Sequence, residues 1–245
     1  MTLSPERVRV ILLDIEGTTT PIAFVHVRLF SYAREHLSRF LDVHFANATV
    51  QDALRRLAAE RDAEADAGAP AWGGASPTEV RASALSYAHW LMDRDRKSPG
   101  LKLLQGLVWE EGYQAGELHG EVFDDVPRSI ARWRDRGLDV AIYSSGSELA
   151  QRGLFASTPD GDLTPLIARF FDTAVGPKGQ PDSYRHIAAA LGVPAAAVLF
   201  VSDVTAELAA ARGAGCDTRL CVRPGNPPQP DAADFAQIES FDELT

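Results

Sequence analysis

The chain has 245 residues, of which 45% are hydrophobic, and its formal net charge at pH 7 is -10. This length and apolar content allow a substantial core, in one large domain or in one domain that carries an insertion. The acidic balance argues against nucleic acid or an anionic membrane as a partner, because binding phosphates with a whole face requires clustered Lys and Arg.

The sequence also argues against a membrane-bound or secreted protein. The longest uncharged run, Ile187–Ser202, contains Gly192 and Pro194 and is shorter than the roughly 18 apolar residues of a membrane span. The first ten residues show no long apolar segment, so no signal peptide is expected. Cys216 and Cys221 are too few for a disulfide framework and suit buried positions in a reducing cytoplasm. We therefore expect a cytoplasmic location.

The first predicted strand ends at two carboxylates. In Val8–Ile22, VRVILLDIEGTTTPI, an apolar run is followed by Asp14, Glu16 and a Gly-Thr-Thr-Thr turn. Both acids are expected at the carboxyl end of a buried parallel strand, where open α/β sheets bind ligands. Asp14 is a candidate nucleophile or metal ligand, and Glu16 is close enough for proton transfer. The alternative is an ordinary turn rich in small polar residues.

Helices are predicted after this strand, because apolar residues recur at helical spacing. One helix is expected near Val50–Glu64, and the Ala/Gly/Pro-rich stretch Gly68–Ser76 is expected to be a loop. Two further helices, before and after these segments, have apolar faces formed by Phe30, Ala33, Leu37, Phe40 and Leu41 and by Val80, Ala84, Tyr87, Ala88 and Leu91.

Near Leu118 the pattern changes to alternating helices and strands. Asp125 is expected to cap a helix that ends at Gly137, and residues 223–226 are expected to form a rigid turn after the last strand. The alternation implies a doubly wound parallel sheet that includes the first strand. We predict a core domain of residues 1–20 and 119–245, with a helical cap domain, residues 21–118, inserted into it. The strands are expected at Val140–Tyr143, near Thr173, at Val198–Val201 and at Thr218–Val222, and the helices near Glu148–Phe155, around Tyr184–Leu191 and at Thr205–Ala214.

Three loops add polar groups at the ends of these strands. Ser144 and Ser145 precede a helix whose free amides could hold a phosphate, although an ordinary serine cap is the alternative. Lys178 could neutralise a phosphoryl group, although a single loop lysine is usually solvated. Asp203 could bind Mg²⁺ together with Asp14, or it could cap a helix. Their joint occurrence at successive strand ends favours a phosphoryl-transfer site.

These residues resemble the motifs of the haloacid dehalogenase-like phosphohydrolases, whose order is an Asp at a strand end, a Ser or Thr, a Lys and a final acidic loop. Here they are Asp14, Ser145 with Ser144 beside it, Lys178 and Asp203. Most phosphatases of that superfamily have Asp where this chain has Glu16. The chain is therefore more similar to the enolase-phosphatase E1 family of methionine salvage, over nearly its whole length. The segments that carry this likeness are DIEGTTTPI, FVHVRLFSYA, GELHGEVFDDVP, YSSGS, DTAVGPKGQPDSYRHIA, SDVTAEL and CVRPGN.

The resemblance implies a Mg²⁺-dependent monomer that enolises 2,3-diketo-5-methylthiopentyl-1-phosphate and hydrolyses the phosphate ester to an acireductone. It implies that Asp14 attacks phosphorus and that Glu16 protonates the leaving oxygen and activates water. It assigns metal binding to Asp14, Glu16 and Asp203, and catalysis or substrate binding to Lys178. It also assigns substrate binding to Ser144 and Ser145.

Two other functions are compatible with the residues. One is a phosphatase of the same scaffold that acts on another small phosphate ester. The other is a receiver-type signalling domain, which also carries an Asp pocket, a hydroxyl and a Lys on a doubly wound sheet. A receiver would carry its phosphoacceptor on a middle strand. Here Asp14 follows the first strand, and an insertion of about a hundred residues suits an enzyme cap.

Overall fold

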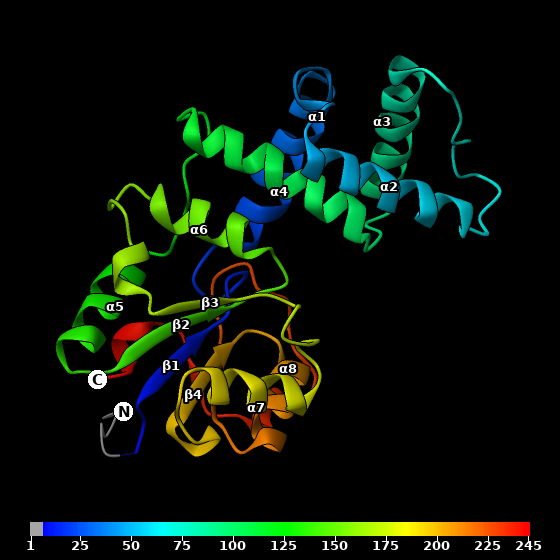
Figure 1. Ribbon diagram of the computed structural model, residues 1–245. Helices are drawn as coiled ribbons and strands as arrows, with labels where there is room; N and C mark the ends of the chain where they lie inside the picture. The colour runs from blue at the N-terminus through cyan, green and yellow to red at the C-terminus, as the bar shows by residue number, and fades with distance from the viewer. Residues whose placement is uncertain (1–6) are drawn as a thin grey trace. The chain divides into compact units, whose positions relative to one another are not determined.

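Two units of different architecture make up this computed structural model, which describes residues 7–245 (Figure 1). The first unit combines the described part of Met1–Val25 with Leu118–Thr245, and the second is His26–Glu117. The insertion predicted from the sequence spans residues 21–118. Within residues 7–245, no helix is both long and apolar enough to cross a membrane.

A six-stranded parallel sheet forms the centre of the first unit, in the order β3-β2-β1-β4-β5-β6. The first strand belongs to this sheet, as the sequence predicts, and the structure places it between β2 and β4. The two-residue β6 was not predicted, because two residues show no periodicity. The strands are β1 (Val10–Leu13), β2 (Asp139–Tyr143), β3 (Arg169–Phe171), β4 (Val198–Ser202), β5 (Asp217–Cys221) and β6 (Gln237–Ile238).

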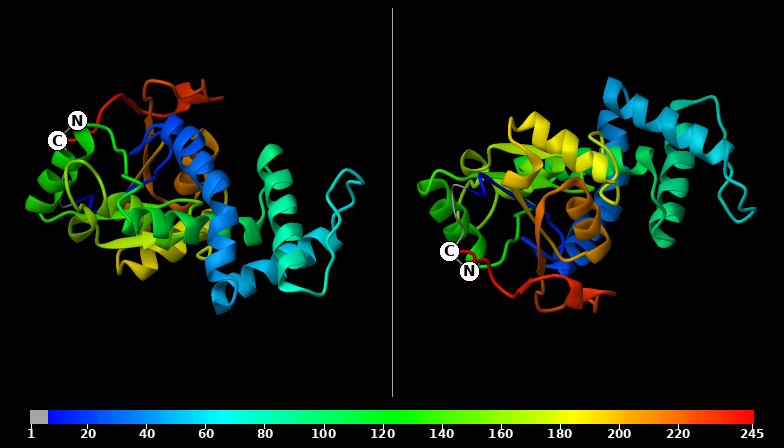
Figure 2. Two further views of the ribbon diagram at one scale, coloured as in Figure 1. Left: turned by 90° about the horizontal axis from the view of Figure 1, so that it is seen from above. Right: turned by 90° about the horizontal axis from the view of Figure 1, so that it is seen from below.

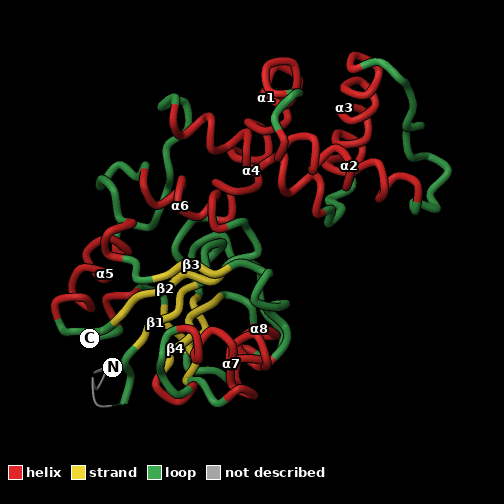
Figure 3. Tube along the Cα trace, viewed as in Figure 1, coloured by secondary structure: helices red, strands yellow, loops and turns green. Residues whose placement is uncertain are grey.

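Helices lie on both faces of this sheet (Figures 1 and 3). Val10 and Leu12 of β1 pack in one cluster with Ile187 of α7 and Leu208 of α8, while the alternating residues of the strand face the other side. The fold is thus the predicted doubly wound, Rossmannoid α/β domain. Its helices are α5 (Asp125–Asp135), α6 (Glu148–Ala156), α7 (Pro181–Ala190) and α8 (Thr205–Ala214), with short 3-10 turns η2 (Thr164–Leu166), η3 (Ala195–Ala197), η4 (Ala232–Asp234) and η5 (Phe241–Glu243).

The end of the chain packs against α5 (Figures 1 and 2). The indole of Trp133 is fully buried, contacts the Phe241 ring, and donates a hydrogen bond to the Leu244 carbonyl. The prediction that Asp125 caps this helix is wrong: the cap position belongs to Asp124, and Asp125 is a buried carboxylate that pairs with Arg223 at 2.9 Å. Sequence patterns missed this pair because its partners are 98 positions apart.

The second unit is helical. Its elements are the π-helix η1 (Phe24–Leu29), which begins in the first unit, and α1 (Phe30–His44), α2 (Ala48–Asp62), α3 (Pro77–Asp93) and α4 (Pro99–Gln114). The three helices predicted here correspond to α1, α2 and α3. The buried residues of α1 and α3 include most of those on the predicted apolar faces.

Helix α4, which packs against α1 and α2, was not predicted. It contains Gly100, Gly106 and Gly112, all buried, and glycine is a poor helix former. A Cβ on Gly100 would lie 2.9 Å from the backbone nitrogen of Leu57 and 3.1 Å from the Ala53 carbonyl oxygen. Close contact between two helix backbones, rather than helix propensity, therefore explains this glycine.

We expect Gly100→Ala to destabilise the helical unit. Alanine favours a helix by roughly 1 kcal/mol, but overpacking against the backbone of α2 costs about 1–3 kcal/mol. The matched control is Gly73→Ala in the loop before α3, where a Cβ would have no neighbour within 4 Å. Urea unfolding followed by circular dichroism measures both variants. Equal stability of Gly100→Ala and the wild type would show that α2 and α4 can move apart to accommodate the added methyl group without a loss of stability.

Candidate active site

The four predicted motifs meet at the carboxyl edge of the sheet. Leu13 of β1 is in register with Ile142 of β2 and Val201 of β4, so these parallel strands end at one level. Asp14 follows β1, and Asp203 follows β4. The loops that begin at these strand ends therefore share one edge, which in open α/β sheets is the ligand-binding edge.

Lys178 joins two carboxylates at this edge. Its Nζ lies 2.6 Å from Oδ1 of Asp14 and 2.6 Å from Oε2 of Glu207. The exposed fractions of the Lys178, Asp14 and Glu207 side chains are only 10%, 6% and 17%, so water screens these charges weakly. Burial lowers the pKa of the Lys178 ammonium, but the two carboxylates outweigh this effect and raise it to about 12. Lys178 is a fixed cation and not a solvated loop lysine.

Glu207 was not selected as a site residue from the sequence. Burial and the Asp14 carboxylate raise its pKa, and the Lys178 ammonium opposes them. The sequence did contain a signal. Glu207 lies in the first turn of α8, directly after the Asp203 loop, and so close to the carboxyl end of β4.

The Asp14 carboxylate is held in a defined orientation. Oδ1 accepts a hydrogen bond from the Ile15 amide at 2.8 Å as well as one from Lys178. The Ser202 hydroxyl lies 3.2 Å from Oδ2 of Asp14 and 3.1 Å from Glu207. A hydroxyl has one proton, so Ser202 can donate to only one of these two acids at a time. These contacts suit a carboxylate that must meet a substrate atom from one direction.

The loop that carries Lys178 is fixed by two tyrosines from neighbouring elements. The Tyr143 hydroxyl, at the end of β2, donates to the Gly176 carbonyl, and the Tyr184 hydroxyl of α7 donates to the Lys178 carbonyl, each at 2.8 Å. Gly176 has a φ of +135°, which an L side chain rarely adopts. The position of the ammonium is thus set by backbone contacts as well as by its ion pairs.

Asp203 approaches the Asp14 loop at Gly17. Gly17 has a φ of +69°, and a Cβ there would lie 2.3 Å from Oδ2 of Asp203, so only glycine permits this contact. Burial raises the pKa of Asp203 to about 7, and the negative charge of Asp14 adds to the effect. The Asp203 carboxylate therefore lies in a place where a further positive charge would stabilise its ionised form.

The available donors fit Mg²⁺. Carboxylate oxygens are hard ligands, and Mg²⁺ is usually held by one or two protein carboxylates, with water and substrate phosphate completing its shell. Asp14 and Asp203 provide two such carboxylates. Among residues 7–245, no group of three or more His, Cys, Asp or Glu side chains is arranged to hold a metal ion, so the structure does not gather Asp14, Glu16 and Asp203 into one set of ligands. Glu16 lies half-buried on the Asp14 loop, with its backbone paired to Thr20.

The predicted serines follow β2 and differ in exposure. Ser144 is buried, and its Oγ accepts a hydrogen bond from the Gly146 amide, while Ser145 is exposed. The helix cap is a third serine, Ser147, which accepts from an amide of α6. Gln151 of α6, also not predicted, donates to the Gly146 carbonyl. Ser144 and Ser145 therefore remain free of the capping role that was their alternative explanation.

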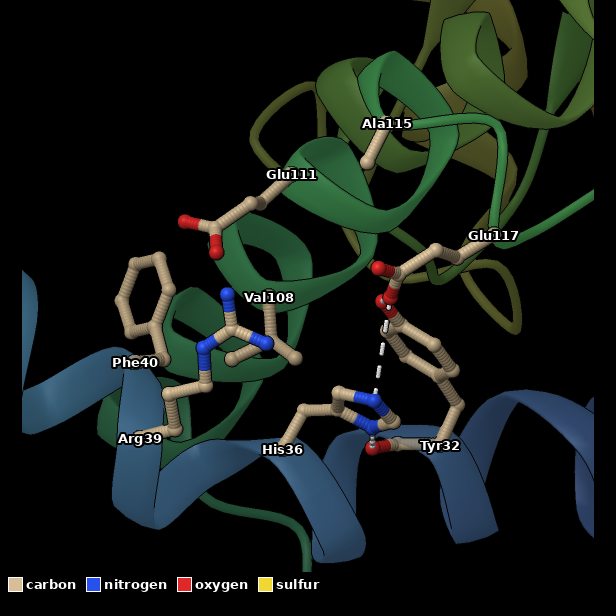
Figure 4. Close-up of a pocket in the computed structure, with 8 residues that line it drawn as sticks. All are labelled: Tyr32, His36, Arg39, Phe40, Val108, Glu111, Ala115 and Glu117. Atoms are coloured by element: carbon tan, nitrogen blue, oxygen red, sulfur yellow. Dashed lines mark hydrogen bonds and ion pairs between the residues drawn. The ribbon is translucent and has the colours of Figure 1, made fainter.

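A second polar cluster lies entirely within the helical unit (Figure 4). The Tyr32 hydroxyl donates to Glu117 at 2.7 Å, and the His36 ring stacks on Tyr32 with its centroid 3.8 Å away. Burial and the Glu117 carboxylate raise the pKa of Tyr32. The cavity beside these residues has a volume of only about 60 Å³. The contacts link α1 to the segment after α4 and are distinct from the predicted site.

Comparison with known proteins identifies the family. The model of the family described as "Hydrolase: haloacid dehalogenase-like hydrolase" matches residues 8–215. Enolase-phosphatase E1 of Synechococcus elongatus is 49% identical over 240 residues, covering 98% of this chain and 99% of the relative. Enolase-phosphatase E1 of Drosophila persimilis is 42% identical, with 97% and 98% covered.

A solved structure shows the same arrangement. The UTR4 protein of Saccharomyces cerevisiae superposes with a TM-score of 0.76 at 33% identity, over 97% of this chain and 100% of that one. The order of the strand-end residues and the order of the strands in the sheet are consistent with the similarity to these relatives, which extends over nearly the full length of the chain. The chain belongs to the haloacid dehalogenase-like hydrolases and, within them, to the enolase-phosphatase E1 family.

Proposed function

We propose that this protein is an enolase-phosphatase of methionine salvage. It enolises 2,3-diketo-5-methylthiopentyl-1-phosphate and then removes the phosphate to release an acireductone, 1,2-dihydroxy-3-keto-5-methylthiopentene. The observation that carries the proposal is the oriented Asp14 carboxylate, 2.6 Å from the Lys178 ammonium at the ligand-binding edge of the sheet, in a chain of this family. A phosphatase for another small ester would share this site, so the enol step distinguishes the two.

Asp14 is proposed as the nucleophile. Its carboxylate oxygen forms a bond to phosphorus while the bond from phosphorus to the substrate oxygen breaks, which leaves an aspartyl phosphate. Glu16 donates a proton to the leaving oxygen and then takes one from the water that hydrolyses the aspartyl phosphate. Lys178 offsets the negative charge that the phosphoryl group brings to Asp14 and Glu207.

Three further groups, Ser144, Ser145 and Mg²⁺, are proposed to bind the substrate. Ser144 and Ser145 hold phosphate oxygens at the end of β2, where the free amides of α6 add favourable dipoles. Mg²⁺, held by Asp14, Glu16 and Asp203, would lower the repulsion between the nucleophile and the phosphate, and would stabilise the enolate oxygen. The helical unit, His26–Glu117, serves as the cap.

We place the enzyme in the cytoplasm, because its two cysteines are buried free thiols. We also propose that it acts as a monomer.

Removal of Mg²⁺ with EDTA should abolish turnover of the diketone phosphate, because the single positive charge of Lys178 does not balance two carboxylates and a phosphate dianion. Phosphate release and enol absorbance are followed together, before chelation and after Mg²⁺ is restored. Full activity in EDTA would contradict the metal requirement. A wild type that releases phosphate but forms no enol at any time would be a simple phosphatase.

Asp14→Asn should lower the rate of phosphate release by at least about 10³-fold, because the amide is not a nucleophile. Excess Mg²⁺ should not restore the rate, whereas it would if only metal affinity were lost. If calorimetry shows that the variant still binds Mg²⁺, enol phosphate should accumulate without phosphate release. The control is Asp160→Asn, an exposed loop change in the same unit. Labelled phosphate trapped on another residue would reassign the nucleophile.

Lys178→Met should reduce kcat by about 10²–10³-fold, because a preorganised charge at the phosphoryl group is lost. Lys178→Arg keeps the charge and should retain more of the activity. Thermal unfolding of both variants checks that the fold persists. Similar activity in the two variants would mean that the positive charge has no catalytic role.

A further inference from the structure

The nucleophile loop, residues 14–20, is buried over most of its length. The amides of Thr18, Thr19 and Thr20 all donate to the Ile15 carbonyl within the loop. The Gly17, Thr18 and Thr19 carbonyls are thereby left without partners inside the loop. Buried carbonyls require donors, so another segment has to supply them.

The exit from β5 supplies two of these donors. Asn226 Nδ2 donates to the Gly17 carbonyl at 2.9 Å, and Arg223 Nε donates to the Thr18 carbonyl at 3.2 Å. The Phe123 amide completes the row by donating to the Thr19 carbonyl at 3.0 Å. Three successive carbonyls of the loop are thus bound by groups more than a hundred positions away in the chain.

The Arg223 guanidinium is itself rigidly held. It pairs with Asp125 at 2.9 Å and donates to the Glu239 carbonyl at 3.0 Å. Phe123 and Phe241 cover it, with their ring centroids 4.5 and 4.8 Å from the guanidinium carbon. Its side chain is 4% exposed. A planar cation fixed on so many sides gives the Thr18 carbonyl a donor that cannot move away.

The contact at Gly17 connects this support to catalysis. Gly17 is the residue that meets Asp203, and Oδ1 of Asn226 lies 3.0 Å from the position that a Gly17 Cβ would occupy. Asn226 also donates to the Cys221 carbonyl, at the end of β5. A shift of Gly17 would therefore change the separation of the Asp14 loop from Asp203. Arg223 and Asn226 both lie beyond residues 8–215, the part of the chain that the family model covers.

We propose that Arg223 and Asn226 are positioning residues that hold the Asp14 loop at its working distance from Asp203. They touch backbone atoms rather than substrate, so they act through the placement of Asp14 and Gly17. The inference rests on the proposed function, because it takes Asp14 as the nucleophile. A displacement of about 1 Å in a catalytic group is enough to reduce a rate by about 100-fold.

The test uses Asn226→Ala in the full-length protein, with two measurements. Hydrogen–deuterium exchange of the peptide that spans residues 15–20 reports the order of the loop, and it needs neither substrate nor metal. Steady-state kinetics with the diketone phosphate separates kcat from KM. We expect faster exchange in the loop and a kcat that is lower by about 10- to 100-fold, with a smaller change in KM.

The matched control is Asn47→Ala, which changes the only other asparagine of the chain. Asn47 caps α2 through the amides of Thr49 and Val50, so its loss lowers stability without touching the loop. Arg223→Lys is a second variant. It keeps a cation for Asp125 but loses the Nε donor, and it should change exchange and kcat in the same direction as Asn226→Ala.

The outcomes separate the two proposals. Unchanged loop exchange in Asn226→Ala would overturn the positioning role, whatever happens to kcat. Faster exchange with full kcat would overturn it as well, because the order of the loop would then not affect the reaction. A wild type that releases no phosphate would instead refute the proposed function, while the exchange measurement would still report whether Asn226 orders the loop.

Discussion

The buried carboxylate of Asp14 is the group on which the rest of this site depends. It lies at the end of the central strand, near Glu207 and Asp203, so three acids share a region that water reaches poorly. Isolated buried charges are costly, and like charges raise that cost. Lys178 compensates part of it, whereas burial, with the Asp14 charge adding to the effect, raises the pKa of Asp203. A further positive charge would stabilise the ionised forms of these acids.

The need to hold the Asp14 carboxylate in place also explains why the surrounding backbone is so constrained. If Asp14 acts as proposed, its carboxylate has to be placed precisely, because a misplacement of about 1 Å can reduce a rate by about 100-fold. The neighbouring loops are correspondingly fixed: Tyr143 and Tyr184 hold the Lys178 loop, and Gln151 holds the loop after β2. Each anchor comes from a helix or strand of the core. The geometry of these two loops is therefore set by the sheet and its helices.

The C-terminal segment has a comparable structural role. It contributes only the two-residue β6 to the sheet, yet it carries Ser240 and Phe241, whose Oγ and amide donate to Asp125. Asp125 in turn pairs with Arg223. A buried ion pair is seldom a source of net stability, but the removal of one partner is strongly destabilising. The pair thus restricts the end of the chain to one arrangement beside α5, because another arrangement would leave a buried charge without its partner.

Much of the fold and part of the site followed from the sequence by itself. Strand ends, apolar faces and the order of Asp14, Lys178 and Asp203 are local patterns, and the alternation of helices and strands allows few sheets other than a parallel one. Only the tertiary structure decided the role of Glu207, the pairing of Asp125 with Arg223 and the existence of α4. In each case the deciding contact joins residues far apart in the chain, or depends on the absence of a side chain, as at Gly100. Periodicity reports which face of an element is buried, and it carries no information about the partner that buries it.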